Sequence, residues 1–160
     1  MHSIHVTDFG LAKHMDSDSS VTGSGAAIGT PHYMAPEQAG GHSDRVCAES
    51  DVYSLGAILF ALLTGRPPIQ ADTVVQTLLQ VVHEPAPAVR EIRPEVPIDL
   101  ETIVAKCLEK SPGKRYESAE KLADELDAFI EDRHIEARPR SQVLKAWHWL
   151  EGVPVVGALA

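Results

Sequence analysis

Two stretches decide the fold of this chain: Gly29-Thr-Pro-His-Tyr-Met-Ala-Pro-Glu37 and Ser50-Asp-Val-Tyr-Ser-Leu-Gly56. The second continues into Ala57-Ile-Leu-Phe-Ala-Leu-Leu63, so that a helix from Asp51 to Leu63 would be apolar on every side. Such a helix is far shorter than the ~20 residues that span a membrane, and it is typical of a helix buried inside a larger body. Gly65 and the pair Pro67-Pro68 are expected to end it.

Three amphipathic helices are predicted further along the chain. Asp72 can cap the first, which Pro85 ends, and a second runs from Leu100 to Leu108 before Pro112. Ser118 can cap the third. The apolar stripes are Val74, Val75, Leu78, Leu79 and Val82; then Leu100, Ile103, Val104, Cys107 and Leu108; then Ala119, Leu122, Ala123, Leu126, Phe129 and Ile130, with Glu120, Asp124 and Glu125 facing water.

The N-terminal part of the chain has a different character. Ile4-His-Val6 alternates and meets a glycine turn, which predicts a short strand. Residues 14–30 are rich in Ser, Asp, Gly and Thr, and this composition predicts a long loop.

Length and composition exclude several classes of protein. A chain of 160 residues is one domain or a piece of one, and a net charge of −9 argues against nonspecific binding to nucleic acid. The two cysteines, Cys47 and Cys107, lack zinc-site spacing and indicate free thiols in a reducing compartment. Cys107 lies on an apolar stripe and is placed in the core. No signal-peptide core is present at the N-terminus, and the apolar residues 153–160 are too few to span a bilayer.

The order of three motifs points to a family. Asp8-Phe9-Gly10 precedes the two stretches quoted above, and together they closely resemble the Hanks-type bacterial Ser/Thr protein kinases. Leu62–Pro68 and Lys106–Arg115 are similar to later landmarks of that family, so the resemblance covers about residues 3–131. It implies a mainly α fold, the truncated helical large lobe of a kinase with a short N-terminal strand and a long activation loop. The alternative is an unrelated helical scaffold that carries these motifs by chance.

The resemblance assigns roles near the N-terminus. It makes Asp8 the ligand of the Mg²⁺ that bridges ATP phosphates, with Phe9 and Gly10 as structural residues beside it. An ordinary Asp-Phe-Gly turn is the alternative. Thr30 matches the threonine whose hydroxyl reaches the catalytic aspartate of active members, and residues 31–35 would form the floor under the substrate hydroxyl.

Three further residues receive structural roles from the resemblance. Glu37 matches a glutamate that pairs with a distant arginine, here Arg115, and this pair would hold the segment on which substrates lie. Asp51 matches the residue that accepts backbone hydrogen bonds from the catalytic loop. Its alternative role is the N-terminal cap of its own helix.

The loop offers five hydroxyl residues as candidate phosphorylation sites: Ser17, Ser19, Ser20, Thr22 and Ser24. A phosphate orders a loop by pairing with cations, and Lys13 and Arg45 are the nearby candidates. A plain solvated linker is the alternative.

Most of the catalytic parts of a kinase do not occur in this sequence. It has no Gly-x-Gly-x-x-Gly, and it has no His-Arg-Asp motif to supply the catalytic base. We therefore expect a parent kinase that uses ATP and Mg²⁺ to phosphorylate Ser/Thr of a protein substrate, while the isolated chain binds neither and is inactive. The missing half would be encoded upstream. The alternative function is a non-catalytic interaction module, a split or decayed kinase that docks on a kinase partner.

Residues 132–160 form a tail after the predicted kinase part, residues 1–131. Asp132–Arg140 and Leu144–Leu150 resemble the juxtamembrane stretch of bacterial receptor-like kinases. Basic residues before the pair Trp147 and Trp149 fit the cytoplasmic side of a membrane helix. We thus expect a cytoplasmic location, with a parent that is tethered to the membrane by a single span. An ordinary amphipathic terminal helix is the alternative.

Overall fold

The computed structural model describes residues 31–137. These residues form helices and no strand, so the predicted mainly α fold is confirmed for this part of the chain. The predicted strand at residues 4–6 and the loop at residues 14–30 lie outside the described residues.

The central element is α2 (Ala48–Thr64). Gly65 ends it as predicted, with a φ of 79° and an N–H that donates to the Ala61 carbonyl at 2.8 Å. The start of α2 differs from the prediction. It begins at Ala48 with Cys47 at the cap position, so the alternative role of Asp51 as N-terminal cap is wrong.

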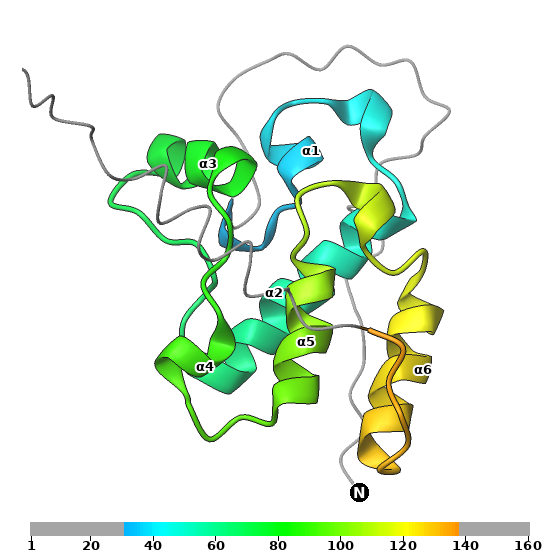
Figure 1. Ribbon diagram of the computed structural model, residues 1–160. Coiled ribbons are helices and arrows are strands. Elements are labelled where there is room, and N and C mark those ends of the chain that lie inside the picture. Colours follow the sequence, from blue (N-terminus) through cyan, green and yellow to red (C-terminus); the bar gives the residue numbers. More distant parts are fainter. Residues whose placement is uncertain (1–30, 138–160) are drawn as a thin grey trace, which may run out of the picture.

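Two helices pack against α2 to form one side of the core. In Figure 1, α5 (Ile98–Cys107) lies beside α2, and α6 (Ala119–Ile130) contacts both. A β-carbon at Gly56 would lie 2.3 Å from that of Cys107, so glycine is needed where α2 and α5 approach most closely. Both cysteines are free, and Cys107 is completely buried as predicted. This cluster also contains Val52, Ile103, Tyr116, Leu122, Ala128, Ile135 and Ala137.

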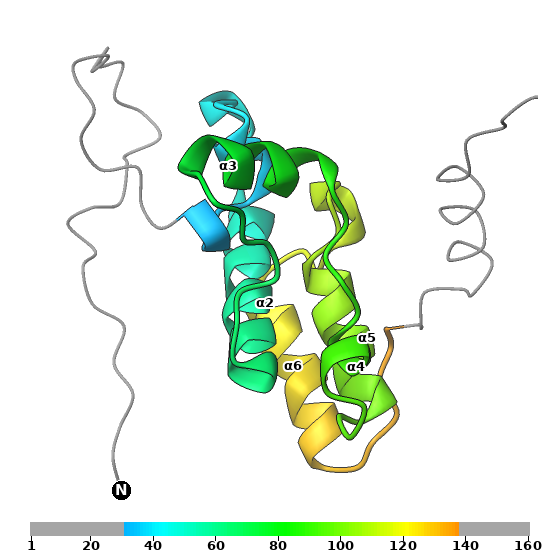
Figure 2. The ribbon, with the colours of Figure 1, turned by 90° about the vertical axis from the view of Figure 1, so that its left-hand side faces the viewer.

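A second cluster surrounds the other side of α2. Tyr53, Ala57 and Phe60 pack against residues of α5 and of the short helix α4 (Val89–Ile92). At the opposite end, α3 (Val74–His83) lies beside α1 (Pro36–Ala39), as both Figure 1 and Figure 2 show. Three 3-10 turns, η2 (Pro31–Tyr33), η3 (Ser43–Arg45) and η4 (Pro112–Lys114), connect these elements.

The structure corrects the predicted cap and the predicted inner face of α3. Thr73, not Asp72, caps the helix by accepting the Gln76 N–H at 3.2 Å. The buried residues are Thr77 and Val81, whereas three members of the predicted stripe, Val74, Val75 and Leu79, are exposed. Thr77 can be buried because its hydroxyl donates to the Thr73 carbonyl and accepts the Ala71 N–H.

The predicted buried face of α6 is also partly wrong. Ser118 caps it as predicted by accepting the Lys121 N–H at 3.2 Å, and Leu122 is buried. Ile130, placed on the inner stripe, is 75% exposed, while Glu125, predicted to face water, is buried. The core face of α6 is therefore rotated relative to its apolar pattern.

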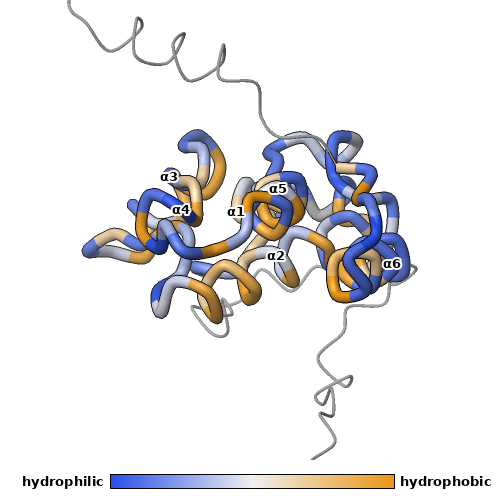
Figure 3. The backbone as a smooth tube through the Cα atoms, turned by 60° about the horizontal axis from the view of Figure 1, so that its bottom comes forward, coloured by the Kyte–Doolittle hydropathy of each residue, from blue (hydrophilic) through white to orange (hydrophobic). Residues whose placement is uncertain are grey.

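The outer face of α2 is exposed among the described residues: Leu55, Ile58 and Leu62 are 41%, 47% and 77% exposed. Residues 31–137 therefore do not cover this face, and the burial of the helix inside a larger body stays a prediction. We call these three residues the α2 stripe. They recur at helical spacing, and Figure 3 shows that hydrophobic residues are frequent along this helix.

Candidate functional site

A buried ion pair joins two segments that are far apart in the sequence. The Arg115 Nη1 and Nη2 atoms donate to Oε1 and Oε2 of Glu37 at 2.8 and 2.9 Å. The side chains of Arg115 and Glu37 are 0% and 5% exposed. Two parallel charge-assisted hydrogen bonds fix both distance and orientation. The contact that the resemblance implies is thus present in the structure.

The remaining donors of Arg115 are also used. Nε donates to the Glu109 carbonyl at 2.8 Å, Nη1 to the Glu49 carbonyl at 2.9 Å and Nη2 to the Lys110 carbonyl at 3.1 Å. A guanidinium can be buried at low cost only when its donors are satisfied in this way. Arg115 therefore ties α1, the start of α2 and the α5–η4 connection together.

Ser50 is a member of this network that the sequence analysis did not single out for this role. Its hydroxyl donates to Glu37 Oε1 at 2.6 Å and accepts the Cys47 N–H at 3.2 Å. Ser50 occupies the third helical position of α2, where a polar side chain commonly accepts the backbone N–H of the cap residue. This position in the sequence could have indicated that the Ser50 side chain forms a hydrogen bond.

The environment of Glu37 keeps its carboxylate ionised. Burial raises the pKa of Glu37, but hydrogen bonds from Arg115 and Ser50 outweigh it, so that the pKa lies below its usual value. A carboxylate that is ionised at neutral pH and accepts several hydrogen bonds is suited to holding structure. It is not suited to exchanging protons near neutral pH.

Tyr53 extends the network toward α3. The Arg115 guanidinium carbon lies 5.0 Å from the Tyr53 ring centroid, and Lys110 Nζ lies 5.6 Å from it. Lys110 Nζ also donates to the Val81 carbonyl of α3 at 2.6 Å. Burial raises the pKa of Tyr53 to about 12, so the phenol stays neutral. Neither Tyr53 nor Lys110 was predicted to belong to the site.

The network positions the segment that contains η2 and α1. Glu37 lies in α1, and the Ser54 hydroxyl of α2 donates to the Tyr33 carbonyl of η2 at 2.9 Å. Side chains of α2 thus hold this segment at two points, and Arg115 reinforces one of them. The arrangement orients residues 31–39 and carries out no chemistry by itself.

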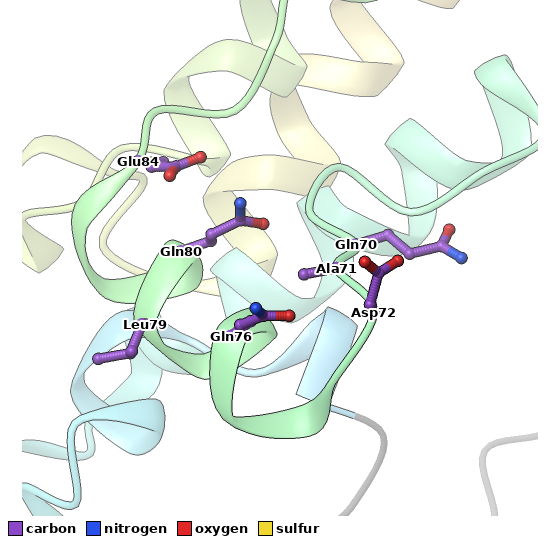
Figure 4. Close-up of a pocket in the computed structure, with 7 residues that line it drawn as sticks. All are labelled: Gln70, Ala71, Asp72, Gln76, Leu79, Gln80 and Glu84. Carbon is purple, nitrogen blue, oxygen red and sulfur yellow. The ribbon is translucent and has the colours of Figure 1, made fainter.

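A polar recess lies between α3 and the loop before it (Figure 4). It has a volume of about 540 Å³ and is lined by Gln70, Ala71, Asp72, Gln76, Leu79, Gln80 and Glu84. Two carboxylates and no Lys or Arg line it, so it does not suit the phosphates of a nucleotide. In the part of the chain that the structure describes, no three His, Cys, Asp or Glu side chains could share a metal ion.

A family model described as the protein kinase domain matches residues 1–126 of the chain. This chain belongs to the protein kinase family. A serine/threonine-protein kinase PrkC of Bacillus subtilis is 40% identical over 139 residues, which are 86% of this chain and 21% of that protein. A serine/threonine-protein kinase PknB of Mycobacterium tuberculosis is 43% identical over 127 residues, 78% of this chain and 20% of that protein. The kinase chain spans about a fifth of the length of these relatives.

The other site residues predicted for the kinase chain belong to its first 30 residues, except Asp51. Asp8, Phe9, Gly10 and Thr30 lie outside the described residues, as do the five candidate phosphorylation sites: Ser17, Ser19, Ser20, Thr22 and Ser24. The family implies ATP and Mg²⁺ as cofactors of the complete kinase.

Asp51 is described, and its surroundings differ from those of Glu37. It lies in the first turn of α2, is exposed, and occupies the same face as the α2 stripe, one turn before Leu55. An exposed carboxylate at the end of an apolar stripe is free to accept hydrogen bonds from an element that covers it.

Among residues 31–137, no helix is both long enough and apolar enough to cross a bilayer.

Proposed function

We propose that this chain is part of the large lobe of a Ser/Thr protein kinase that transfers the γ-phosphoryl group of ATP to a protein hydroxyl. The observation that carries the proposal is the buried Glu37–Arg115 pair, which holds residues 31–39 against α2. By the family resemblance, those residues form the floor under the substrate hydroxyl. Phosphoryl transfer depends on positioning and electrostatics, so a rigidly held floor is a requirement of the reaction.

The proposed roles of the other residues follow the family pattern. Asp8 would hold the Mg²⁺ that accompanies ATP, because a hard cation prefers carboxylate oxygen. Thr30 would reach the catalytic aspartate of the complete kinase through its hydroxyl. Asp51 would accept backbone N–H groups of the catalytic loop, and Arg115 is a positioning residue that acts through Glu37.

The chain alone is expected to transfer no phosphate. Of the phosphate loop, the lysine, the base and the two metal ligands, its sequence contains one metal ligand, Asp8. The first assay incubates the purified chain with Mg²⁺, labelled ATP and a generic protein substrate. We expect no label above a boiled control, and no change with Asp8→Ala. Incorporation that Asp8→Ala abolishes would show catalysis by unrecognised groups.

The decisive assay supplies the missing parts. The N-terminal part of the Bacillus subtilis PrkC kinase domain, up to its metal-binding motif, is fused in frame before residue 3 of this chain. We expect phosphorylation of the substrate that is abolished by Asp8→Ala and retained by Asp16→Ala, a carboxylate outside the motif. A fusion that binds ATP but shows no activity would contradict the proposal.

Non-catalytic docking on a kinase partner is a second candidate function, favoured by the α2 stripe. Three large apolar side chains exposed on one helix face are typical of a surface that another element covers. Under this proposal the chain binds an intact kinase, and Leu62→Lys abolishes binding. The fusion assay separates the two functions, because docking alone predicts no Asp8-dependent activity. The juxtamembrane role of the tail stays a prediction.

A further inference from the structure

The chain reverses its direction directly after α6. Asp132 has a φ of 54°, and the Arg133 N–H donates to the Ala128 carbonyl at 2.8 Å, which closes the end of the helix. Residues 133–137 then run back alongside α6, as the orange segment in Figure 1 shows. The left-handed conformation of Asp132 is what makes this reversal possible.

Glu125 receives the returning segment. One of its carboxylate oxygens, Oε1, accepts the backbone N–H groups of Glu136 and Ala137, the second at 3.2 Å. The residue is 6% exposed, and no cation in the described part of the chain forms an ion pair with it. A buried carboxylate without a cation needs such N–H donors. If the segment detaches, water can replace these N–H donors. The Glu125 carboxylate is then not left buried without hydrogen bonds.

The segment also covers a part of the core. Ile135 and Ala137 are buried in the cluster that contains Cys107 and Tyr116. Tyr116 is buried there as well, and burial together with the nearby Glu125 carboxylate raises the pKa of its phenol. Burial raises the pKa of Cys107 to about 12, and the thiol is therefore unreactive while covered.

We propose that residues 133–137 form a detachable strap, latched by Glu125, that couples the chain beyond Ala137 to the core around Cys107. Two buried side chains, Ile135 and Ala137, and three backbone N–H groups that donate to α6 hold the strap, which is far less than holds α2 or α5 in place. Weakly held segments open before the rest of a protein unfolds. A partner or force that acts on the residues after Ala137 competes directly with the Glu125 latch. The proposal does not depend on phosphoryl transfer.

The test compares Glu125→Ala with Asp127→Ala, which removes the same charge from an exposed position of α6. Both are made in the full chain with Cys47→Ser, so that Cys107 is the single thiol. Hydrogen exchange of residues 133–137 and the labelling rate of Cys107 by a disulfide reagent are measured under native conditions. For Glu125→Ala we expect both rates to rise about tenfold or more, the effect of losing hydrogen bonds to a charged group.

The amide exchange rates of α2 distinguish local opening of the strap from a general loss of stability. The proposal requires that amide exchange in α2 stay within about twofold of that in the Asp127→Ala protein. Equal rates in residues 133–137 for both variants would overturn it, and so would equal acceleration in α2 and the strap. If Glu125→Ala does not fold, Glu125→Gln carries the same comparison, because it removes the charge and keeps one acceptor oxygen.

Discussion

The Arg115→Ala substitution tests the buried ion pair most directly. It would remove five hydrogen bonds, leaving the Glu37 carboxylate without its cation and with Ser50 as the remaining side-chain donor of the network, and taking one donor from each of three backbone carbonyls. Breaking a buried pair on one side costs about 3–5 kcal/mol, because the remaining charge loses its compensation. Small domains are stable by only about 5–15 kcal/mol, so this loss is a large fraction of the total. Urea unfolding followed by circular dichroism measures the change.

The control is Arg93→Ala, which breaks an ion pair of the same type on the surface. The side chains of Arg93 and Glu95 are 52% and 64% exposed, and their atoms lie 2.8 Å apart. An exposed pair contributes about 1 kcal/mol or less. If Arg115→Ala costs no more than Arg93→Ala, the buried pair does not hold the network together. The double variant Arg115→Met with Glu37→Leu should recover part of the loss, because it removes both charges.

Gly56→Ala places a β-carbon 2.3 Å from that of Cys107, and we expect a loss of about 1–3 kcal/mol in urea unfolding from the overpacking. Gly113→Ala, with nothing within 4 Å of the new carbon, is its control; equal effects would contradict the close approach. Because the pKa of Glu37 is lowered by folding, its contribution to stability is present above the ordinary glutamate pKa of about 4.3 and is lost as the pH falls through the folded value. Glu37→Gln should therefore flatten the loss of stability below about pH 4.3, and an unchanged acid limb would refute this. The exposed α2 stripe should bind a hydrophobic dye, Leu62→Ser should reduce the signal, and a chain that shows no dye enhancement would mean that the stripe is covered.

The functional network was predictable only in part. The family motifs suggested the contact between Glu37 and Arg115 although 78 positions separate them. The same network contains Ser50, Tyr53 and Lys110. No sequence motif indicated that these three residues belong to it. Their contacts arise because α2 brings Ser50 and Tyr53 to Arg115, and because the loop after α5 brings Lys110 to the Val81 carbonyl of α3.

The sequence by itself determined the features that depend on local conformation and spacing. The apolar stripe of α5, the core position of Cys107, the stop at Gly65 and the cap at Ser118 are of this kind, because each depends on residues within one or two helical turns.

Only the tertiary structure decided which faces of α3 and α6 are buried. Glu125 lies inside because N–H groups 11 and 12 positions later in the chain return to its carboxylate, and a charged group is buried wherever such donors reach it. The apolar pattern of α6 cannot predict those donors, because they come from a different segment that folds back over the helix.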